Sequence, residues 1–502
     1  MTQIPEYEGL IVFGDSWSDT GIVQGLFLQS FGFPIYNPDI TSSGRFTTGL
    51  NFIDLLSGHL DFTPEQVTNF AVGGAQLLTD RTWNDMTGGL LSPDDPNRDF
   101  RVDVVGQIDQ FLAGLSPDAD LSGMAASLLI GGNDILQSGI VDGTEAEIIA
   151  QATALGQDMV DALLAQAVRL ADAGVGTLLL YTSPGPQVLP RSLTQPDALV
   201  LAGTVTGEIL NDGLRDGIAQ LEAMGLQVEL IEQGALMEEV AADFASFGFQ
   251  TYNDPVTLDN ATINPAVAGI PFDQIPMLDG IHKTEAFDRI IAQFEFESLT
   301  SAVTIGGAQR DVIMGDQGDS LRDMVLARDG DDLVLAGDGA DVVMGGLGHD
   351  RLLGGQGADL LGGGSGDDRL GGGAGRDILA DHAGDDRVAG GAGRDVLIDG
   401  AGSDVHLGGG GADVFVYTDQ ALLGGDSSGD QNRFLGGAGA DTLILRLSDT
   451  EAQAFNEGAL SLADLGITAR GIETVVAVAG LEVPDLIDGT PLVDQADSWG
   501  FL

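Results

Sequence analysis

Up to about residue 302, short continuous apolar runs alternate with longer segments in which apolar residues recur at helical spacing. The runs are bounded by turn residues, as buried strands are, and they cover residues 9–14, 67–72, 125–130, 175–181 and 226–231. The helical patterns cover residues 151–173, 206–224, 235–247 and 284–298. Strands that alternate with helices predict an α/β domain with a mainly parallel sheet.

Polar or small residues stand directly after several of these expected strands, among them Ser16, Gly74, Asn133 and Ser183. In an open parallel sheet the carboxyl ends of the strands gather at one edge, where ligands bind. The region 247–279 contains four prolines, which exclude a long helix. We expect this loop to shape a pocket at that edge, with a plain connector as the alternative.

A nine-residue period replaces these patterns from residue 327 onward. Glycine recurs at every ninth position from Gly330 to Gly411, and an aspartate follows each glycine by two residues. Two residues after each aspartate stands an apolar residue, except in one repeat, where His406 takes the place. This pattern predicts a parallel β-roll that binds Ca²⁺ in its turns. The repeat aspartates expected to hold Ca²⁺ are Asp332, Asp341, Asp350, Asp359, Asp368, Asp377, Asp386, Asp395, Asp404 and Asp413.

The repeat pattern resembles that of the RTX family of proteins. A further repeat covers residues 436–444, and two degenerate units begin at Gly306 and Gly315. The loops that open at Asp381 and Asp399 lack the double-glycine start, so the sites there are less well defined. The resemblance implies bacterial type I secretion machinery as a partner, an uncleaved C-terminal signal, and an extracellular or cell-surface location.

Two repeats make one turn of such a roll, so side chains 18 residues apart stack in one column. One outer column is basic and contains Arg351, Arg369 and Arg387. The column on the opposite sheet is apolar and contains Val342, Leu360, Ile378, Val396 and Val414. We expect the tail after residue 445 or the first domain to cover the apolar column, with tolerated exposure of β-branched residues as the alternative.

Charge and composition narrow the classes of partner. Lys and Arg number 20 against 77 Asp and Glu, and the formal net charge of −57 argues against nucleic acid or an anionic membrane surface. There is no cysteine, so disulfides and thiolate metal sites are excluded. No apolar run approaches the roughly 20 residues that span a bilayer, and we expect no transmembrane segment. The N-terminus also lacks the basic segment of a Sec-type signal.

A nucleophilic serine at position 16 needs a base, and the histidines point to one. Three of the five histidines lie in the repeats, which leaves His59 and His282. His282 follows Asp279 by three residues in a loop just before the last helix of the first domain, and one loop can present both groups to a serine. His59 is interpreted as a surface residue. The sequence GDSSG at residues 425–429 imitates a nucleophile motif, but no histidine follows Ser427, which we interpret as a loop residue.

Four blocks, in order, resemble those of the GDSL or SGNH hydrolase family: GDS with Ser16, NFAVGGA with Gly74, GGND with Asn133, and DGIH with Asp279 and His282. The resemblance covers residues 9–298 and implies a flavodoxin-like, three-layer α/β fold. It also implies Ser16 as nucleophile, His282 as general base, Asp279 as orienting carboxylate, and an oxyanion hole of the Ser16 and Gly74 N–H groups and the Asn133 amide.

Two details of this resemblance stay open. Gly73 is a near-equal alternative to Gly74, because the block contains adjacent glycines. Lys283 stands where the family usually has proline after the histidine, which leaves the shape of that loop undefined.

We therefore expect three regions: residues 1–302, the hydrolase domain; residues 303–445, the RTX β-roll; and residues 446–502, a cap with the type I secretion signal. The expected function is a secreted serine ester hydrolase that acts on lipid or short-to-medium acyl esters through an acyl-serine intermediate, with no catalytic cofactor. A carbohydrate acetylesterase and a non-catalytic RTX surface or adhesion protein are the alternatives.

Overall fold

A computed structural model describes residues 7–31, 46–48, 50–190, 195–259, 262–267, 270–271, 274–278, 281–315, 322–423, 429–480 and 499. The chain divides into two compact units. One contains residues 4–238 and 251–299, and the other contains residues 1–3, 239–250 and 300–502. None of the described helices is long and apolar enough to cross a membrane.

The first unit is built on a five-stranded parallel sheet with the strand order β2-β1-β3-β4-β5. Its strands are β1 (Gly9–Gly14), β2 (Val67–Asn69), β3 (Met124–Leu129), β4 (Thr177–Tyr181) and β5 (Gln227–Ile231). A small antiparallel pair, β6 (Thr257–Asp259) and β7 (Thr262–Ile263), lies in the later loop. This strand order is that of flavodoxin-like folds, so the predicted fold class is confirmed.

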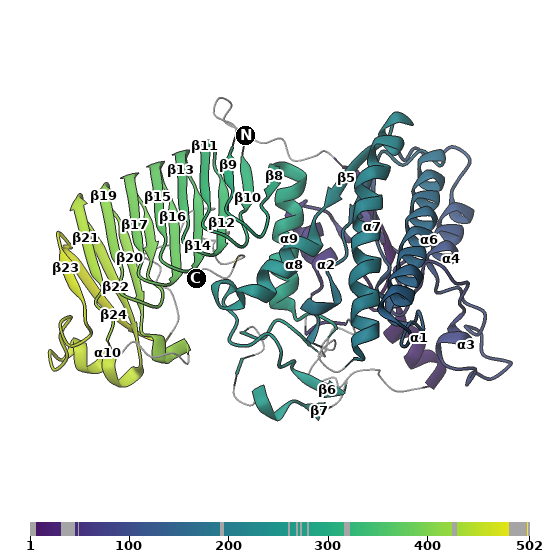
Figure 1. Ribbon diagram of the computed structural model, residues 1–502, viewed down its shortest axis with the longest axis horizontal. Helices are drawn as coiled ribbons and strands as arrows, with labels where there is room; N and C mark the ends of the chain where they lie inside the picture. The colour runs from purple at the N-terminus through teal and green to yellow at the C-terminus, as the bar shows by residue number, and fades with distance from the viewer. Residues whose placement is uncertain are drawn as a thin grey trace. The chain divides into compact units, whose positions relative to one another are not determined.

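Helices cover both faces of this sheet (Figure 1), with α4, α6 and α7 on one side and α2 and α9 on the other. The helices are α1 (Ile22–Phe31), α2 (Phe52–His59), α3 (Trp83–Met86), α4 (Val104–Gly114), α5 (Gly132–Leu136), α6 (Glu145–Asp172), α7 (Asp197–Ala223), α8 (Gln233–Ala242) and α9 (Glu285–Thr300). The apolar core between the sheet and α4, α6 and α7 includes Phe13, Leu128, Met159 and Leu214.

Local sequence explains where these elements begin and end. Thr144 and Glu147 form a capping box at the start of α6, and Gly174, at φ +94°, takes the left-handed conformation just after its end. The helix predicted over residues 235–247 instead ends at Ala242 and is followed by a 3-10 turn, Phe244–Phe247. Asp243, at φ −132° and ψ 58°, is not helical, and it interrupts the helix there.

The second unit is a roll of two parallel sheets whose strands alternate along the chain. One sheet holds β8 (Ala302–Ile305), β10 (Asp323–Leu326), β12 (Val342–Leu347), β14 (Leu360–Ser365), β16 (Ile378–Ala383), β18 (Val396–Ile398), β20 (Val414–Thr418), β22 (Thr442–Leu447) and β24 (Thr474–Ala479). The other holds β9 (Val312–Met314), β11 (Leu333–Asp338), β13 (Arg351–Gly357), β15 (Arg369–Gly375), β17 (Arg387–Gly393), β19 (Val405–Gly410), β21 (Arg433–Ala438) and β23 (Thr468–Arg470).

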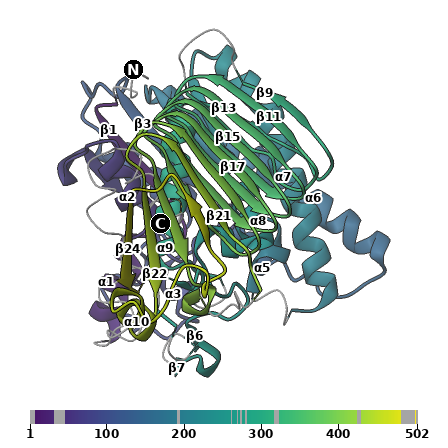
Figure 2. The same ribbon diagram turned by 90° about the vertical axis from the view of Figure 1, so that its left-hand side faces the viewer.

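The pairing register of the roll follows the repeat. Leu352 pairs with Leu370 and Leu370 with Val388, each 18 residues further on. The two sheets lie face to face (Figure 2), and the apolar residue of each repeat fills the space between them. The sheets continue through β23 and β24, and α10 (Asp449–Asn456) packs Ala452 against this core.

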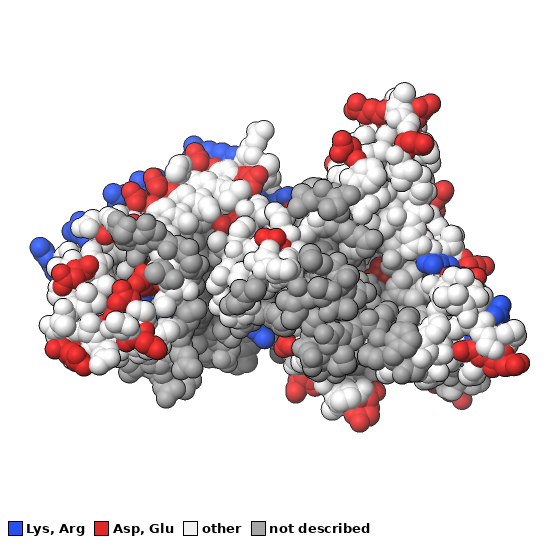
Figure 3. All heavy atoms as spheres, turned by 90° about the horizontal axis from the view of Figure 1, so that it is seen from below, with Lys and Arg blue, Asp and Glu red and all other residues white. Residues whose placement is uncertain are grey.

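The two predicted outer columns are present and differ in exposure. Arg351, Arg369 and Arg387 pair in register and are exposed, and basic side chains recur along one edge of the roll in Figure 3. The apolar column, Val342, Leu360, Ile378, Val396 and Val414, is buried. The turn Phe244–Phe247, which belongs to this unit, contacts β14 and β16 and covers part of that face.

Candidate functional site

Ser16 and His282 meet at the carboxyl end of β1. The end of this strand is fixed because the Gln107 side chain accepts from Gly14 N and donates to Gly14 O, both at 2.9 Å. Ser16 follows directly, and its Oγ lies 2.8 Å from His282 Nε2. A histidine nitrogen at this distance can accept the hydroxyl proton as the oxygen attacks a substrate.

The backbone N–H groups of Gly73 and Gly74, which follow β2, differ in their hydrogen bonds. Gly73 N donates to the buried carboxylate of Asp19 at 2.9 Å, so that N–H group is already used. Gly74 takes φ +81°, which favours glycine, and among the described residues its N–H has no hydrogen-bond acceptor. Of the two, Gly74 is therefore the one with a donor available to an oxyanion.

Another donor, the Asn133 side chain, lies at the start of α5. Asn133 lines the same cavity as Ser16, and its Nδ2 lies 3.4 Å from Asp15 Oδ2. Asp134, next to it, accepts from Leu77 N at 2.8 Å and Leu78 N at 3.0 Å. Asp134 thereby ties the Asn133 turn to the segment after the glycine pair.

Asp15 is buried between the nucleophile turn and Asn133. Its Oδ1 accepts from Trp17 N at 3.2 Å. Burial raises the pKa of Asp15 to about 6, although the Trp17 hydrogen bond and the nearby His282 and Lys283 act in the opposite direction. Asp15 thus fixes the turn around Ser16 and holds the amide of Asn133.

Lys283, the residue that departs from the family pattern, is buried behind the site. Its Nζ lies 3.7 Å from the centre of the Trp17 ring and 3.7 Å from Asp288 Oδ1. Burial lowers the pKa of Lys283, and burial raises the pKa of Asp288 to about 7. The lysine therefore connects the nucleophile turn to α9 through a buried ion pair and a cation–π contact.

The Ser16–His282 pair opens into a cavity of about 420 Å³. Besides Gly74 and Asn133, its walls are mostly apolar and include Val23, Phe46, Met86, Ile130, Ile135, Leu136, Pro184, Pro186 and Leu189. This volume is that of a small-molecule pocket.

Some features expected from the sequence are not found at this site or lie outside the described residues. Asp279 and Ser427 lie outside the described residues. The loop 247–279 was expected to shape the pocket, but none of its described residues lines the cavity. The segment after β4, with Pro186 and Leu189, and Met86 of α3 form walls instead. Residues this far apart in sequence give no local signal of a shared pocket.

His59 is half-buried against another ring, and it is not among the cavity residues. Its ring centroid lies 5.4 Å from that of Phe296, and burial lowers the pKa of His59. The sequence interpretation as a surface residue is therefore only partly right, because a neighbouring helix shields one side of the ring.

All the repeat aspartates have one common arrangement in the roll. The Oδ1 of each accepts a backbone N–H from the preceding turn, as in Asp350 N to Asp368 Oδ1 at 2.7 Å and Asp368 N to Asp386 Oδ1 at 2.6 Å. The other oxygen, Oδ2, is buried and has no hydrogen-bond partner among the described residues. This holds for Asp332, Asp341, Asp350, Asp359, Asp368, Asp377, Asp386, Asp395, Asp404, Asp413 and Asp441.

These orphaned oxygens fit a divalent cation. Burial raises the pKa of the aspartates, to about 6 at Asp341 and Asp377 and to about 8 at Asp359 and Asp368. Ca²⁺ takes six to eight oxygen ligands, and carboxylates with glycine-turn carbonyls are the donors it prefers. The residues present thus suit structural Ca²⁺, whose positive charge would balance the negative charges of the buried carboxylates.

Comparisons with known proteins agree with both units. A family model described as GDSL-like lipase/acylhydrolase matches residues 10–294, and the model of the RTX calcium-binding nonapeptide repeat (four copies) matches residues 318–352, 345–379 and 382–415. A GDSL esterase/lipase of Arabidopsis thaliana is 30% identical over 220 residues, which are 42% of this chain. The chain spans 59% of the length of that relative.

Two solved structures show a weak likeness. Phospholipase A1 from Streptomyces albidoflavus NA297 aligns with 59% of this chain and all of its own, at 14% identity and a TM-score of 0.30. LAE5, an alpha/beta hydrolase from the metagenome of Lake Arreo, Spain, aligns with 58% of this chain and 94% of its own, at 15% identity and a TM-score of 0.26. The family match covers more than half of the residues, and the chain belongs to the GDSL-like lipase/acylhydrolase family, with RTX calcium-binding repeats after the hydrolase fold.

Proposed function

We propose that this protein is a secreted serine ester hydrolase that cleaves acyl esters with a hydrocarbon acyl chain. The observation that carries the proposal is the 2.8 Å contact between Ser16 Oγ and His282 Nε2 at an apolar cavity. Gly74 and Asn133 line the same cavity and supply donors beside the serine. A nucleophile, its base and oxyanion donors in one pocket are the parts that acyl transfer requires.

In this proposal Ser16 Oγ attacks the ester carbonyl carbon while His282 Nε2 takes the hydroxyl proton. The negative charge on the carbonyl oxygen is stabilised by the N–H groups of Ser16 and Gly74 and by the Asn133 amide. The C–O bond to the alcohol then breaks, and His282 returns the proton to the leaving oxygen. Water, deprotonated by the same histidine, cleaves the acyl-serine. Asp279 is assigned the role of orienting His282.

The walls of the cavity support the choice of substrate. Met86, Ile135, Leu136 and Leu189 offer apolar contacts in a volume of about 420 Å³. A hydrocarbon chain gains roughly 0.8 kcal/mol for each methylene that it buries, whereas a sugar would leave hydroxyl groups without partners there. An acyl ester of short to medium length therefore fits better than an acetylated carbohydrate.

The roll and the tail complete the proposal. Residues 303–445 bind structural Ca²⁺ through Asp332 and the later repeat aspartates, and Ca²⁺ takes no part in catalysis. Residues 446–502 provide a cap and the signal for a bacterial type I secretion channel, and the protein acts outside the cell. Support comes from the RTX family match and the unpartnered buried carboxylate oxygens.

A fluorophosphonate probe tests the chemistry. We expect it to label Ser16 in the full-length, Ca²⁺-loaded protein, and mass spectrometry of the labelled peptide identifies the residue. Ser16→Ala should abolish labelling, and His282→Gln should slow it strongly. Ser427→Ala is the matched control, because it removes the serine of the GDSSG motif at residues 425–429 and should leave labelling unchanged.

A series of p-nitrophenyl esters from acetate to dodecanoate tests the substrate class. We expect kcat/KM to rise from acetate toward the medium chains as the cavity fills. Labelling that survives Ser16→Ala would refute the nucleophile, and a maximum at acetate together with hydrolysis of acetylated glycans would refute the hydrocarbon substrate.

A further inference from the structure

Two successive turns of the roll depart from the repeat at three buried positions. Asp381 and Asp399 stand where the two preceding turns of the same sheet have Gly345 and Gly363. His406 stands in the column of inward apolar residues, between Val388 and Phe434. All three side chains are buried, with exposed fractions of 0%, 3% and 0% for Asp381, Asp399 and His406.

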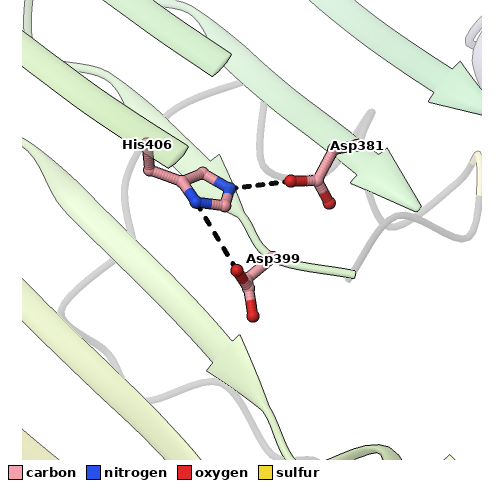
Figure 4. Close-up of side chains that lie close together, drawn as sticks. All are labelled: Asp381, Asp399 and His406. Carbon is pink, nitrogen blue, oxygen red and sulfur yellow. Dashed lines mark ion pairs between the residues drawn. The ribbon is translucent and has the colours of Figure 1, made fainter. Parts of the chain in front are cut away.

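The three side chains converge inside the roll (Figure 4). His406 Nε2 lies 2.8 Å from Asp381 Oδ2, and His406 Nδ1 lies 3.5 Å from Asp399 Oδ1. Ligand atoms from all three residues lie within 4.8 Å of one another. The Cβ of residue 381 points inward, since a Cβ on the equivalent Gly363 would come within 2.7 Å of Asp368 Oδ2.

The surroundings hold each carboxylate by one oxygen only. Gly400 N donates to Asp381 Oδ1 at 2.6 Å, and Asn432 Nδ2 donates to Asp399 Oδ2 at 3.0 Å. The ring of His406 stacks on Phe434 with its centroid 5.0 Å away. Outer hydrogen bonds and stacking of this kind fix the orientation of groups that bind a metal ion.

The atoms that face one another have no hydrogen-bond partner. Both ring nitrogens of His406, Asp381 Oδ2 and Asp399 Oδ1 are buried and unpaired among the described residues. At 2.8 Å, Asp381 Oδ2 is close enough for a hydrogen bond to Nε2, but it lies outside the angular range for one. An imidazole binds one cation through one of its two ring nitrogens. Asp381 faces Nε2 and Asp399 faces Nδ1, so an ion on either nitrogen takes one carboxylate directly beside it and reaches the other within the 4.8 Å that spans the three ligand atoms.

We propose that Asp381, Asp399 and His406 form a binding site for one divalent transition-metal ion, represented by Zn²⁺. The site adjoins the Ca²⁺ column, because carboxylate oxygens of Asp386 and Asp404 lie within 4.8 Å of that of Asp381, and it differs from the Ca²⁺ sites by its imidazole ligand. In a tetrahedral site, metal–ligand bonds of about 2.0–2.2 Å place neighbouring ligand atoms roughly 3.3–3.6 Å apart. The 3.5 Å between Nδ1 and Asp399 Oδ1 has this spacing, and the 2.8 Å between Nε2 and Asp381 Oδ2 would widen when the ion binds. An imidazole ligand selects Zn²⁺ and similar ions, whereas Ca²⁺ takes oxygen ligands.

The position of the site explains why the roll would need it. The aspartate column that passes through Asp386 and Asp404 continues with Asn432. The step from 404 to 432 is 28 residues instead of 18, because a ten-residue insertion follows Asp413. The column therefore loses a carboxylate at this turn, and a metal ion bound beside it ties the turns together where the Ca²⁺ ladder is interrupted.

The test uses full-length protein in saturating Ca²⁺, so that Zn²⁺ does not enter the Ca²⁺ sites. Titration calorimetry with ZnCl₂ and elemental analysis after dialysis measure stoichiometry and affinity. We expect one Zn²⁺ per chain, and an affinity lower by on the order of 100-fold in His406→Leu and Asp399→Gly, which remove a ligand. Asn432→Ala should weaken binding roughly 10- to 100-fold, as loss of an outer hydrogen bond does.

His349→Ala is the matched control, because His349 is an exposed histidine of the same roll. It should bind Zn²⁺ like the wild type. Far-UV circular dichroism verifies that each variant folds on addition of Ca²⁺. Should His406→Leu fail to fold, Asp381→Gly replaces it, since glycine occupies that position in the preceding turn.

Two results would overturn the proposal. One is a wild-type protein that takes up no Zn²⁺, which would leave only contacts between the imidazole ring and the two carboxylates. The other is equal Zn²⁺ affinity in the wild type and in the variants that lack a ligand.

Discussion

The ammonium group of Lys283 lies 3.7 Å above the centre of the Trp17 ring, one residue after the serine proposed as nucleophile. The position of the ammonium group is fixed, because Lys283 is buried and its Nζ lies 3.7 Å from Asp288 Oδ1 of α9. The tight turn that contains Ser16 is thus supported by a positive charge on its inner side. This support has no counterpart in a family pattern with proline at the position after the histidine.

We predict that Lys283→Met lowers both activity and stability. Removing one partner of a buried ion pair costs about 3–5 kcal/mol, and the loss leaves Asp288 buried without its cation. The pKa of Asp288, already raised to about 7 by burial, should rise further. Thermal unfolding and ester hydrolysis against pH measure the two effects.

A double-mutant cycle separates the contact with Trp17 from the ion pair. Trp17→Leu and Lys283→Met, singly and together, should show a coupling in kcat/KM of about 0.5–2 kcal/mol, the range of a cation–π contact. Additive effects of the two substitutions would mean that the stacking does not position the nucleophile turn.

Asn133→Ala should reduce turnover about 100- to 1,000-fold while substrate binding changes little, because an oxyanion donor acts mainly in the transition state. Steady-state kinetics on a p-nitrophenyl ester measure kcat and KM separately. Asn97→Ala is a suitable control, since its amide bonds to Gln29 at the surface. Unchanged turnover in Asn133→Ala would remove this residue from the proposed oxyanion hole.

Removal of Ca²⁺ by a chelator at pH 7.5 should unfold the roll, because the stacked carboxylates of each column, such as Asp341, Asp359 and Asp377, then repel one another without a cation. Far-UV circular dichroism should show loss of β structure. Hydrolysis of a short ester should persist in part, since the proposed mechanism gives Ca²⁺ no role at Ser16. Retention of the full β signal without divalent cations would contradict the assigned role of Ca²⁺.

The metal-free roll should be more stable in mild acid than at neutral pH. Burial raises the pKa of Asp350 to about 7 and that of Asp368 to about 8, well above the value near 3.9 in an unfolded chain. The unfolded chain therefore loses protons first as the pH rises, and folding is progressively disfavoured from about pH 4 to about pH 8.

Melting curves in chelator at several pH values measure this effect. Saturating Ca²⁺ should reverse the trend, because Ca²⁺ binds the ionised carboxylates and protons compete with it. A melting temperature of the metal-free roll that does not change over this pH range would contradict the prediction.

The sequence predicts those features that depend on neighbouring residues or on the strict nine-residue repeat. The turn after Gly14 and the 18-residue columns of Arg351 and Val342 could be read directly, because each follows from neighbouring residues or from a repeat. The choice between Gly73 and Gly74 could not be made, since it depends on Asp19, more than 50 residues away. The contribution of Met86 and Leu189 to the cavity walls could not be predicted either, because these residues are distant from Ser16 in the sequence.

Residues that depart from a repeat or from a family pattern have structural roles that the sequence alone does not reveal. Asp381, Asp399 and His406 were recognised as irregular, but their convergence depends on strands from successive turns. Lys283 was noted as a substitution, and only packing shows that its charge faces Trp17. In both cases a single residue change acquires meaning through a partner that is distant in sequence.

The aspartate ladder also gives the roll a direction. Each Asp N–H donates to a side-chain oxygen on the next turn toward the C-terminus, and the two columns end on different acceptors. Asp404 N donates to Asn432 Oδ1 at 2.8 Å, and Asp441 N donates to Glu473 Oε2 at 2.8 Å. The C-terminal end of each column therefore needs an acceptor other than a repeat aspartate, and Asn432 and Glu473 supply it. Because each turn of such a stack is stabilised by its neighbours, loss of the Glu473 carboxylate should weaken the last turn first.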